Sequence, residues 1–316
     1  MQFADAKKAK RGRVSSQPIE TKKGAKPKRG RPVNKAVAGI MSKKKCSRAT
    51  AFRQRKRSLE FQRTLREKVE AETAKRQHCP IIKPTDNWDI TRVHYPRIDP
   101  DETYGYLPGD LYANALYYFA PAGGLVVAPM AGSGMIHHVY LDRALWAKGR
   151  TEPMEIELRM FDLVPRGPHK PLIERHDLLS GFPPVERPPD YVILDPPYLG
   201  MVRGQYSRLA DDLANMDATG WEAATRCIAQ GCGAVGAKRC TIIVPASVDH
   251  ADWSEVHCPE IVREAWKSVG YRLRRTCYAS KHTQQNPRMA RWNSLAREHR
   301  APIADIAEVL TFDWLG

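Results

Sequence analysis

Asp195-Pro196-Pro197-Tyr198 is the segment whose residue types and spacing point most directly to chemistry. The apolar run Tyr191–Leu194 precedes it, as in a buried parallel strand. Two consecutive prolines cannot continue a strand, so the strand must end there and the chain beyond it is stiff. Ligands of open α/β sheets bind at the carboxyl ends of the strands. The sequence therefore predicts a rigid tip that presents one carboxylate, one carbonyl and one aromatic ring.

A glycine turn forms the second candidate segment. The apolar run from Leu125 to Ala128 predicts a buried strand, and the residues after it predict a turn into a helix from about Met135 to Lys148. Glycines at such a turn allow a ligand to approach the backbone closely. A dinucleotide-binding turn looks similar, but His137 occupies its third glycine position. The candidate cofactor-binding residues of this turn are Pro129, Ala131, Gly132, Ser133 and Gly134.

Two acids follow the next expected strands. Residues 155–161 alternate as a strand that ends at Asp162, and a short strand around residues 172–175 leads to Asp177. An acid at the end of the second strand is placed for a ribose diol. A solvated loop carboxylate is the alternative for each acid, but the order and spacing of the two acids favour a functional role.

The Asp195–Tyr198 tip resembles the Asp-Pro-Pro-Tyr motif of the S-adenosylmethionine-dependent amino-methyltransferases, which methylate the exocyclic amine of adenine or cytosine. Ala131-Gly132-Ser133-Gly134, about sixty residues earlier, resembles the cofactor loop of that family. The resemblance covers roughly residues 104–313. It implies S-adenosylmethionine as the cofactor, with Asp177 near its adenine.

The resemblance also implies a reaction. Asp195 and the carbonyl of Pro196 would accept hydrogen bonds from the amine of a base flipped out of the duplex, and Tyr198 would stack on that base. The Asp at the first position is typical of the adenine enzymes. A cytosine-carbon methylase needs a catalytic Pro-Cys, which is absent from the sequence.

The cofactor loop departs from the family pattern. The family writes it Asp-Pro-Phe-x-Gly-x-Gly, whereas this sequence has Ala128 and Met130 at the Asp and Phe positions. The missing carboxylate normally lies near the amino group of the cofactor. An inactive methylase fold that only binds DNA therefore stays open as an alternative, as does an RNA adenine methyltransferase.

The charge of +16 is concentrated at one end of the chain. Residues 1–80 carry 25 Lys and Arg against 6 Asp and Glu, whereas the remainder carries 26 against 29. A basic arm on a near-neutral domain favours a polyanionic partner, either nucleic acid or an anionic membrane surface.

Within this arm, residues 26–32 resemble an AT-hook for the minor groove of A·T-rich DNA. Glycine allows the backbone to lie deep in the groove while the arginines meet its negative potential. A generic basic tail is the alternative. The candidate DNA-binding residues here are Lys28, Arg29, Gly30, Arg31 and Pro32.

A second basic stretch, residues 280–300, lies between the last two expected strands. Its glutamines and asparagine accompany Lys281, Arg288 and Arg291, which suits phosphate and base contacts. A long basic surface loop is the alternative. Because no large target-recognition domain fits between or after the motifs, specificity must come from short loops, the arm or a partner, and a homodimer stays open.

These patterns predict three regions. Residues 1–46 are expected to be a disordered basic arm, residues 47–80 a basic helix or connector, and residues 81–316 a methyltransferase domain. Its fold is expected to be a Rossmann-like α/β sheet of seven strands, mostly parallel with one antiparallel strand.

Other features exclude alternative classes. The seven cysteines form no Cys-x-x-Cys pair, and His250, His257 and Cys258 match no zinc pattern, so we expect neither a metal site nor disulfides. Prolines and glycines break the uncharged stretch 111–141, so no membrane span is expected. With no apolar leader at the N-terminus, we expect a cytoplasmic, nucleoid-associated protein.

Overall fold

The computed structural model describes Thr64 and residues 82–90, 94–95, 98, 107–199, 207, 212–248, 255–280 and 306–316. All of them belong to the compact unit Gln54–Gly316. The AT-hook-like residues Lys28, Arg29, Gly30, Arg31 and Pro32 lie outside the described residues, as do Lys281, Arg288 and Arg291.

An eight-stranded sheet forms the centre of the domain, in the order β1-β9-β10-β6-β5-β2-β3-β4. Strand β10 is antiparallel to both of its neighbours, and every other neighbouring pair is parallel. The expected mostly parallel sheet with one antiparallel strand is therefore confirmed. The strands are β1 (Asn87–Asp89), β2 (Gly123–Ala128), β3 (Glu155–Asp162), β4 (Ile173–Arg175), β5 (Tyr191–Leu194), β6 (Arg239–Pro245), β9 (Tyr271–Ser280) and β10 (Ile306–Trp314).

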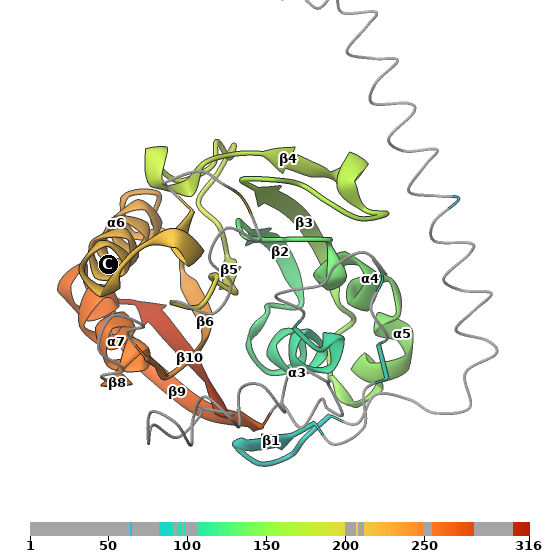
Figure 1. Ribbon diagram of the computed structural model, residues 1–316. Helices are drawn as coiled ribbons and strands as arrows, with labels where there is room; N and C mark the ends of the chain where they lie inside the picture. Colours follow the sequence, from blue (N-terminus) through green and yellow to red (C-terminus); the bar gives the residue numbers. More distant parts are fainter. Residues whose placement is uncertain are drawn as a thin grey trace, which may run out of the picture. The chain divides into compact units, whose positions relative to one another are not determined.

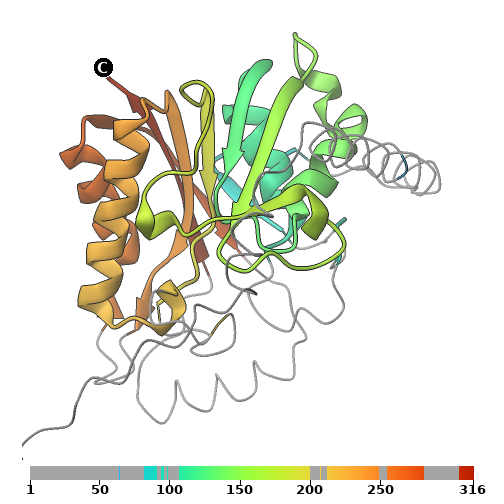
Figure 2. The ribbon, with the colours of Figure 1, turned by 90° about the horizontal axis from the view of Figure 1, so that it is seen from above.

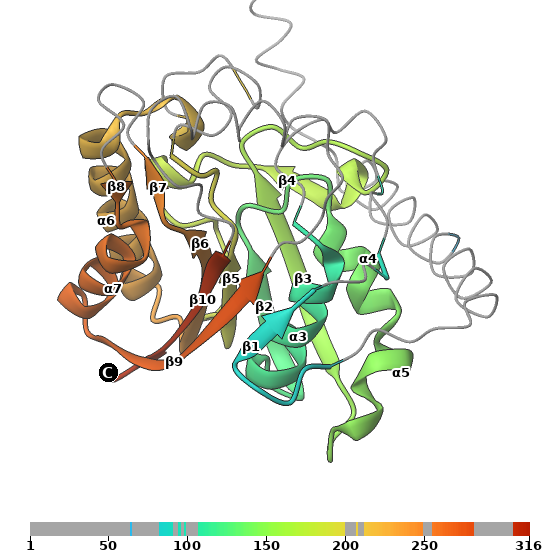
Figure 3. The ribbon, with the colours of Figure 1, turned by 60° about the horizontal axis from the view of Figure 1, so that its bottom comes forward.

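The eighth strand, β1, corrects the expectation of seven strands. It lies before the first of the strands predicted above and pairs in parallel with the carboxyl half of β9, where Trp88 is opposite Ala279 (Figure 3). Three residues are too few to show an alternating pattern. The strand forms because Trp88, only 1 % exposed, joins the core beneath the sheet edge.

Five α-helices are described: α3 (Gly109–Phe119), α4 (Met135–Leu141), α5 (Arg143–Trp146), α6 (Ala218–Ala234) and α7 (Cys258–Ser268). Four short 3-10 helices lie between α5 and α6 in the chain: η1 (Ala147–Gly149), η2 (Lys170–Leu172), η3 (Leu178–Ser180) and η4 (Leu213–Asn215). A two-stranded antiparallel sheet joins β7 (Ser247–Val248) and β8 (Glu255–Val256).

The single helix expected from Met135 to Lys148 is wrong, because the chain breaks between α4 and α5 at Asp142. The Val139 carbonyl near the end of α4 accepts hydrogen bonds from the Asp142 N–H at 3.1 Å and the Trp146 indole at 2.9 Å. These two donors thus satisfy a carbonyl that would accept from the Arg143 N–H in a continuous helix.

Two cores lie on opposite faces of the sheet because strand side chains alternate between the faces. Val126 and Ile193 pack with α3, α4 and α5, whereas Val127 and Val192 pack with α6 and α7. Figures 1 and 2 show this arrangement, with the sheet between the two groups of helices. Both faces being buried explains why the strands read as continuous apolar runs.

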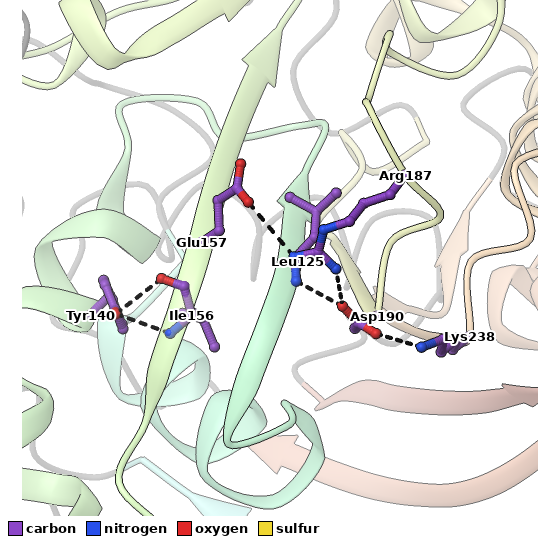
Figure 4. Close-up of polar contacts among 7 residues, drawn as sticks. All are labelled: Leu125, Tyr140, Ile156, Glu157, Arg187, Asp190 and Lys238. Atoms are coloured by element: carbon purple, nitrogen blue, oxygen red, sulfur yellow. Dashed lines mark hydrogen bonds and ion pairs between the residues drawn. The ribbon is translucent and has the colours of Figure 1, made fainter.

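At the amino ends of β2 and β5, the carboxylate of Asp190 ties the sheet together (Figure 4). It accepts hydrogen bonds from the Leu125 amide at 2.8 Å, Arg187 at 2.7 Å and Lys238 at 2.7 Å. Burial acts to raise the pKa of Asp190, but the bonds from Lys238, Leu125 and Arg187 outweigh it and hold the pKa below its usual range. This carboxylate therefore helps to fix the pairing of β2 with β5.

Replacing Asp190 by Ala is expected to lower the free energy of unfolding by about 2 to 3 kcal/mol, because the Leu125 amide loses its side-chain acceptor. Urea denaturation followed by circular dichroism measures the change. Glu174→Ala is the control. It removes an ion pair with Arg159 in which the Glu174 side chain is 57 % exposed, and its effect is expected to stay below about 1 kcal/mol. Equal effects of the two variants would contradict this role of Asp190.

Candidate active site

The two candidate segments lie at the point where the order of strands reverses. After β2 the chain continues to β3 and β4 on one side, whereas after β5 it continues to β6 on the other. β2 and β5 are adjacent and parallel, with Val126 opposite Tyr191. The glycine turn and the Asp195 tip therefore leave neighbouring strands at the same edge. In open α/β sheets this reversal point forms the ligand-binding crevice.

The glycine turn is folded tightly onto β3. The Ala131 N–H donates to the Phe161 carbonyl at 2.9 Å, and the Gly134 N–H donates to the Ala131 carbonyl at 2.8 Å. Gly134 has φ 85°, and a Cβ there would lie 2.6 Å from the Cβ of His169. Glycine is thus required at this position both by the backbone conformation and by close contact with the segment that follows β3.

Asp162, at the end of β3, bonds to the glycine turn itself. One carboxylate oxygen accepts from the Gly132 N–H at 2.8 Å, and the other accepts from the Val164 N–H at 2.8 Å. Burial raises the pKa of Asp162 even though these two backbone bonds act to lower it. The expected acid at the strand end is thus present beside the turn and fixes its conformation. Each oxygen retains a second lone pair that can accept from a ligand.

Asp177 follows β4 at the same edge. Its carboxylate accepts from the Leu179 N–H at 3.0 Å and thereby caps the short turn η3. The side chain is half-buried. Its position after β4 agrees with the sequence-based expectation, whereas a role toward a cofactor stays a prediction.

The tip after β5 has its carboxylate and its aromatic ring in contact. The Tyr198 hydroxyl donates to a carboxylate oxygen of Asp195 at 3.1 Å. Asp195 and Tyr198 are half-buried, whereas Pro196 between them is buried. The four residues of the motif therefore form one compact unit at the crevice.

Three buried histidines pack beside the glycine turn, and the sequence analysis did not identify them as a group. His137 and His138 lie on α4, and His169 lies after β3, with exposures of 8 %, 8 % and 1 %. The Nδ1 atoms of His137 and His169 are 3.3 Å apart, and the ring of Tyr95 lies edge-on to His138. The adjacent His137-His138 pair was visible in the sequence, but its partner His169 is thirty-two residues away.

The burial of these histidines has an electrostatic consequence. Desolvation, and to a smaller extent the neighbouring histidines, lower the pKa of His137 to about 4 and the pKa of His169 to about 3. Both rings are therefore neutral at neutral pH. A hydrogen bond between their Nδ1 atoms requires one ring to donate and the other to accept.

The start of α3 lies near the histidine group, since the Tyr95 ring that contacts His138 also packs on Gly109, the first residue of α3. Asp110 in its first turn accepts from the His94 N–H at 3.0 Å, and the His94 ring lies 2.6 Å from the same carboxylate. Asp110 is 3 % exposed. Leu107 and Pro108, directly before α3, are both buried.

No family model matches the sequence. No curated protein matches it either.

Solved structures with partial similarity include several methyltransferases. TrmN from Thermus thermophilus is 17 % identical with a TM-score of 0.36, over 66 % of this chain and 49 % of that protein. Magnesium protoporphyrin IX methyltransferase from Synechocystis is 12 % identical with a TM-score of 0.37, over 65 % and 81 %. A protein from Thermus thermophilus that is described as a DNA modification methylase is 15 % identical with a TM-score of 0.27, over 44 % of this chain and 49 % of that protein.

These values do not establish a family for the chain. The aligned part spans about half the length of TrmN. At these identities and TM-scores, the similarities assign no function to the chain.

Among the described residues, no group of three or more His, Cys, Asp or Glu side chains is arranged to hold a metal ion. Within the same residues, no helix has the length and apolar character needed to cross a bilayer.

The free energy of unfolding is expected to fall as the pH decreases from about 6.5 to about 4. In this interval the unfolded chain protonates His137 and His169, while the folded protein keeps them neutral. Replacing His169 by Leu is expected to reduce the slope of the free energy of unfolding against pH by up to about 1.4 kcal/mol per pH unit. Urea denaturation at a series of pH values measures this slope.

His257→Gln serves as the control, since the His257 side chain is 71 % exposed. Its stability profile is expected to run parallel to that of the unmodified protein. A His169→Leu profile that also runs parallel would show that the buried histidines do not set the pH dependence.

Proposed function

We propose that the protein transfers a methyl group from S-adenosylmethionine to the exocyclic amine of adenine in DNA. The observation that carries the proposal is the position of the glycine turn and the Asp195–Tyr198 tip on the adjacent strands β2 and β5. Neighbouring strands are about 4.8 Å apart, so groups bound at the turn and at the tip are close enough to react.

The residues at the crevice fit most of the cofactor. The turn offers glycine backbone with positive φ at Gly132 and Gly134, and Asp162 and Asp177 follow the next two strands as acceptors for the ribose and adenine. Ala128 leaves no carboxylate at the end of β2, so the amino end of the cofactor would need another partner. The residues proposed to contact the cofactor are Pro129, Ala131, Gly132, Ser133, Gly134, Asp162 and Asp177.

When bound, the cofactor supplies an electrophilic methyl sulfonium, so the protein's task is to position and desolvate the amine. The lone pair of the adenine amine is delocalised into the ring, which makes the amine a poor nucleophile. Asp195 and the Pro196 carbonyl would accept its two N–H groups, favouring a pyramidal nitrogen with its lone pair toward the methyl group. Tyr198 would stack on the flipped base.

Adenine in DNA is the substrate that the sequence supports best. Asp at the first motif position resembles the adenine enzymes, and the basic arm with its AT-hook-like motif favours DNA. An RNA adenine methyltransferase is the second candidate, because the same tip suits both nucleic acids. A DNA-binding protein without activity is the third, and Ala128 is the feature that favours it.

The proposal is tested by incubating the protein with S-adenosylmethionine labelled on its methyl group and with duplex DNA lacking adenine methylation. Label is expected in the DNA as adenine methylated on its exocyclic amine. Asp195→Ala is expected to lower transfer by at least about 100-fold, because the amine loses its charged acceptor, while cofactor binding measured by calorimetry stays unchanged.

The same assay separates the alternatives. Label that enters RNA but not DNA would select the RNA enzyme. Absence of transfer together with absence of cofactor binding would refute the catalytic proposal and leave the DNA-binding protein.

Substitutions of Tyr198 separate its two roles. Tyr198→Phe keeps the aromatic face but loses the hydrogen bond to Asp195, and is expected to lower kcat about threefold to tenfold. Tyr198→Ala also loses the stacking surface and is expected to raise KM for DNA by about tenfold to 100-fold. Steady-state methyl transfer measures both. Equal KM values for the two variants would contradict stacking by this ring.

A further inference from the structure

One carbonyl of the tip and the carbonyl of the residue after it accept hydrogen bonds from side chains of two other elements. Pro196 and Pro197 have no N–H group, so only carbonyls are available to fix their backbone. The Trp221 indole donates to the Pro197 carbonyl at 3.3 Å, and the Ser247 hydroxyl donates to the Leu199 carbonyl at 2.7 Å. The tip is thus bonded to α6 through the Pro197 carbonyl, and the residue directly after it is bonded to β7.

Trp221 is itself rigidly placed. It lies in the first turn of α6, whose N-cap Asp217 accepts from the Gly220 N–H at 2.7 Å and whose carbonyl accepts from the Trp221 N–H at 2.9 Å. The Trp221 side chain is 0 % exposed and belongs to the same core cluster as Leu194 and Leu199, on either side of the tip. Because the indole is buried and its helix start is fixed, it has little freedom to move if the tip shifts.

Ser247 is placed by a different part of the fold. It begins β7 just beyond the end of β6 and pairs with Val256 of β8. Its bond to Leu199 therefore joins the residue after the tip to the segment that follows β6, the neighbour of β5 on the side away from β2.

Pro196 differs from Pro197 and Leu199 in its hydrogen bonding. Among the residues that the structure describes, none donates a hydrogen bond to the Pro196 carbonyl, although the residue is buried. A carbonyl with no donor among the described residues can accept a hydrogen bond from a ligand. We propose that Trp221 and Ser247 are positioning residues that hold the tip so that the Pro196 carbonyl, together with Asp195, receives the substrate amine.

This inference rests on the proposed methyl transfer, and Trp221→Phe tests it. The variant keeps an aromatic ring but removes the indole N–H. It is expected to lower kcat about tenfold, with KM for the cofactor unchanged, because misplacement of an acceptor slows the chemical step. Ser247→Ala is expected to act in the same direction, and Ser247→Thr, which retains the hydroxyl, to restore the rate.

Trp266→Phe is the matched control. Trp266 of α7 is also buried, at 2 % exposure, but its indole N–H donates to no carbonyl of the residues that the structure describes. Its kcat is expected to stay within about twofold of the unmodified protein. A folded Trp221→Phe variant with the same kcat as Trp266→Phe would overturn the inference.

Hydrogen exchange gives a readout that does not depend on activity. The amides of Tyr198 and Leu199 are expected to exchange faster in Trp221→Phe and Ser247→Ala than in Trp266→Phe. If the unmodified protein transfers no methyl group, the proposed function fails, while the exchange rates still decide whether the two residues hold the tip. Equal exchange in all variants would refute that role.

Discussion

The pairing of β2 with β5 is the constraint on which the site depends. Asp190 secures it at the amino end through both its backbone and its side chain, since its N–H donates to the Leu125 carbonyl and its carboxylate accepts from the Leu125 N–H. A slip of one residue would move every side chain of β5 to the opposite core. Because both faces are buried, the register is strongly specified, and with it the position of Asp195 relative to the glycine turn.

The carboxyl edge of the sheet is stabilised by polar contacts that the site also needs. Asp162 bonds to the amide of Gly132, His169 packs on Gly134, and Trp221 bonds to the Pro197 carbonyl. Each contact holds a turn or tip whose backbone cannot be fixed by the sheet. These contacts fix the backbone of the crevice within the protein itself, so less conformational entropy of the turn and the tip is lost when a ligand binds.

The sequence predicted those parts of the fold whose causes are local. Val192 and Ile193 lie in a buried strand, Pro196 and Pro197 end it, and glycines mark the turn after β2. The strand β1 was missed because it depends on Trp88 meeting β9, far along the chain. Likewise, the contact of Trp221 with Pro197 joins parts of the chain that no local pattern relates. The break at Asp142 depends on a side-chain bond from Trp146 to the Val139 carbonyl, which the spacing of apolar residues does not reveal.

The most direct test is a structure of the protein in complex with S-adenosylhomocysteine, the product of the proposed cofactor. The account predicts that it binds between the turn 129–134 and the tip 195–198, with its sulfur toward Asp195 and Pro196 and its ribose toward Asp162. Binding at any other surface, or no binding at saturating concentration, would contradict it.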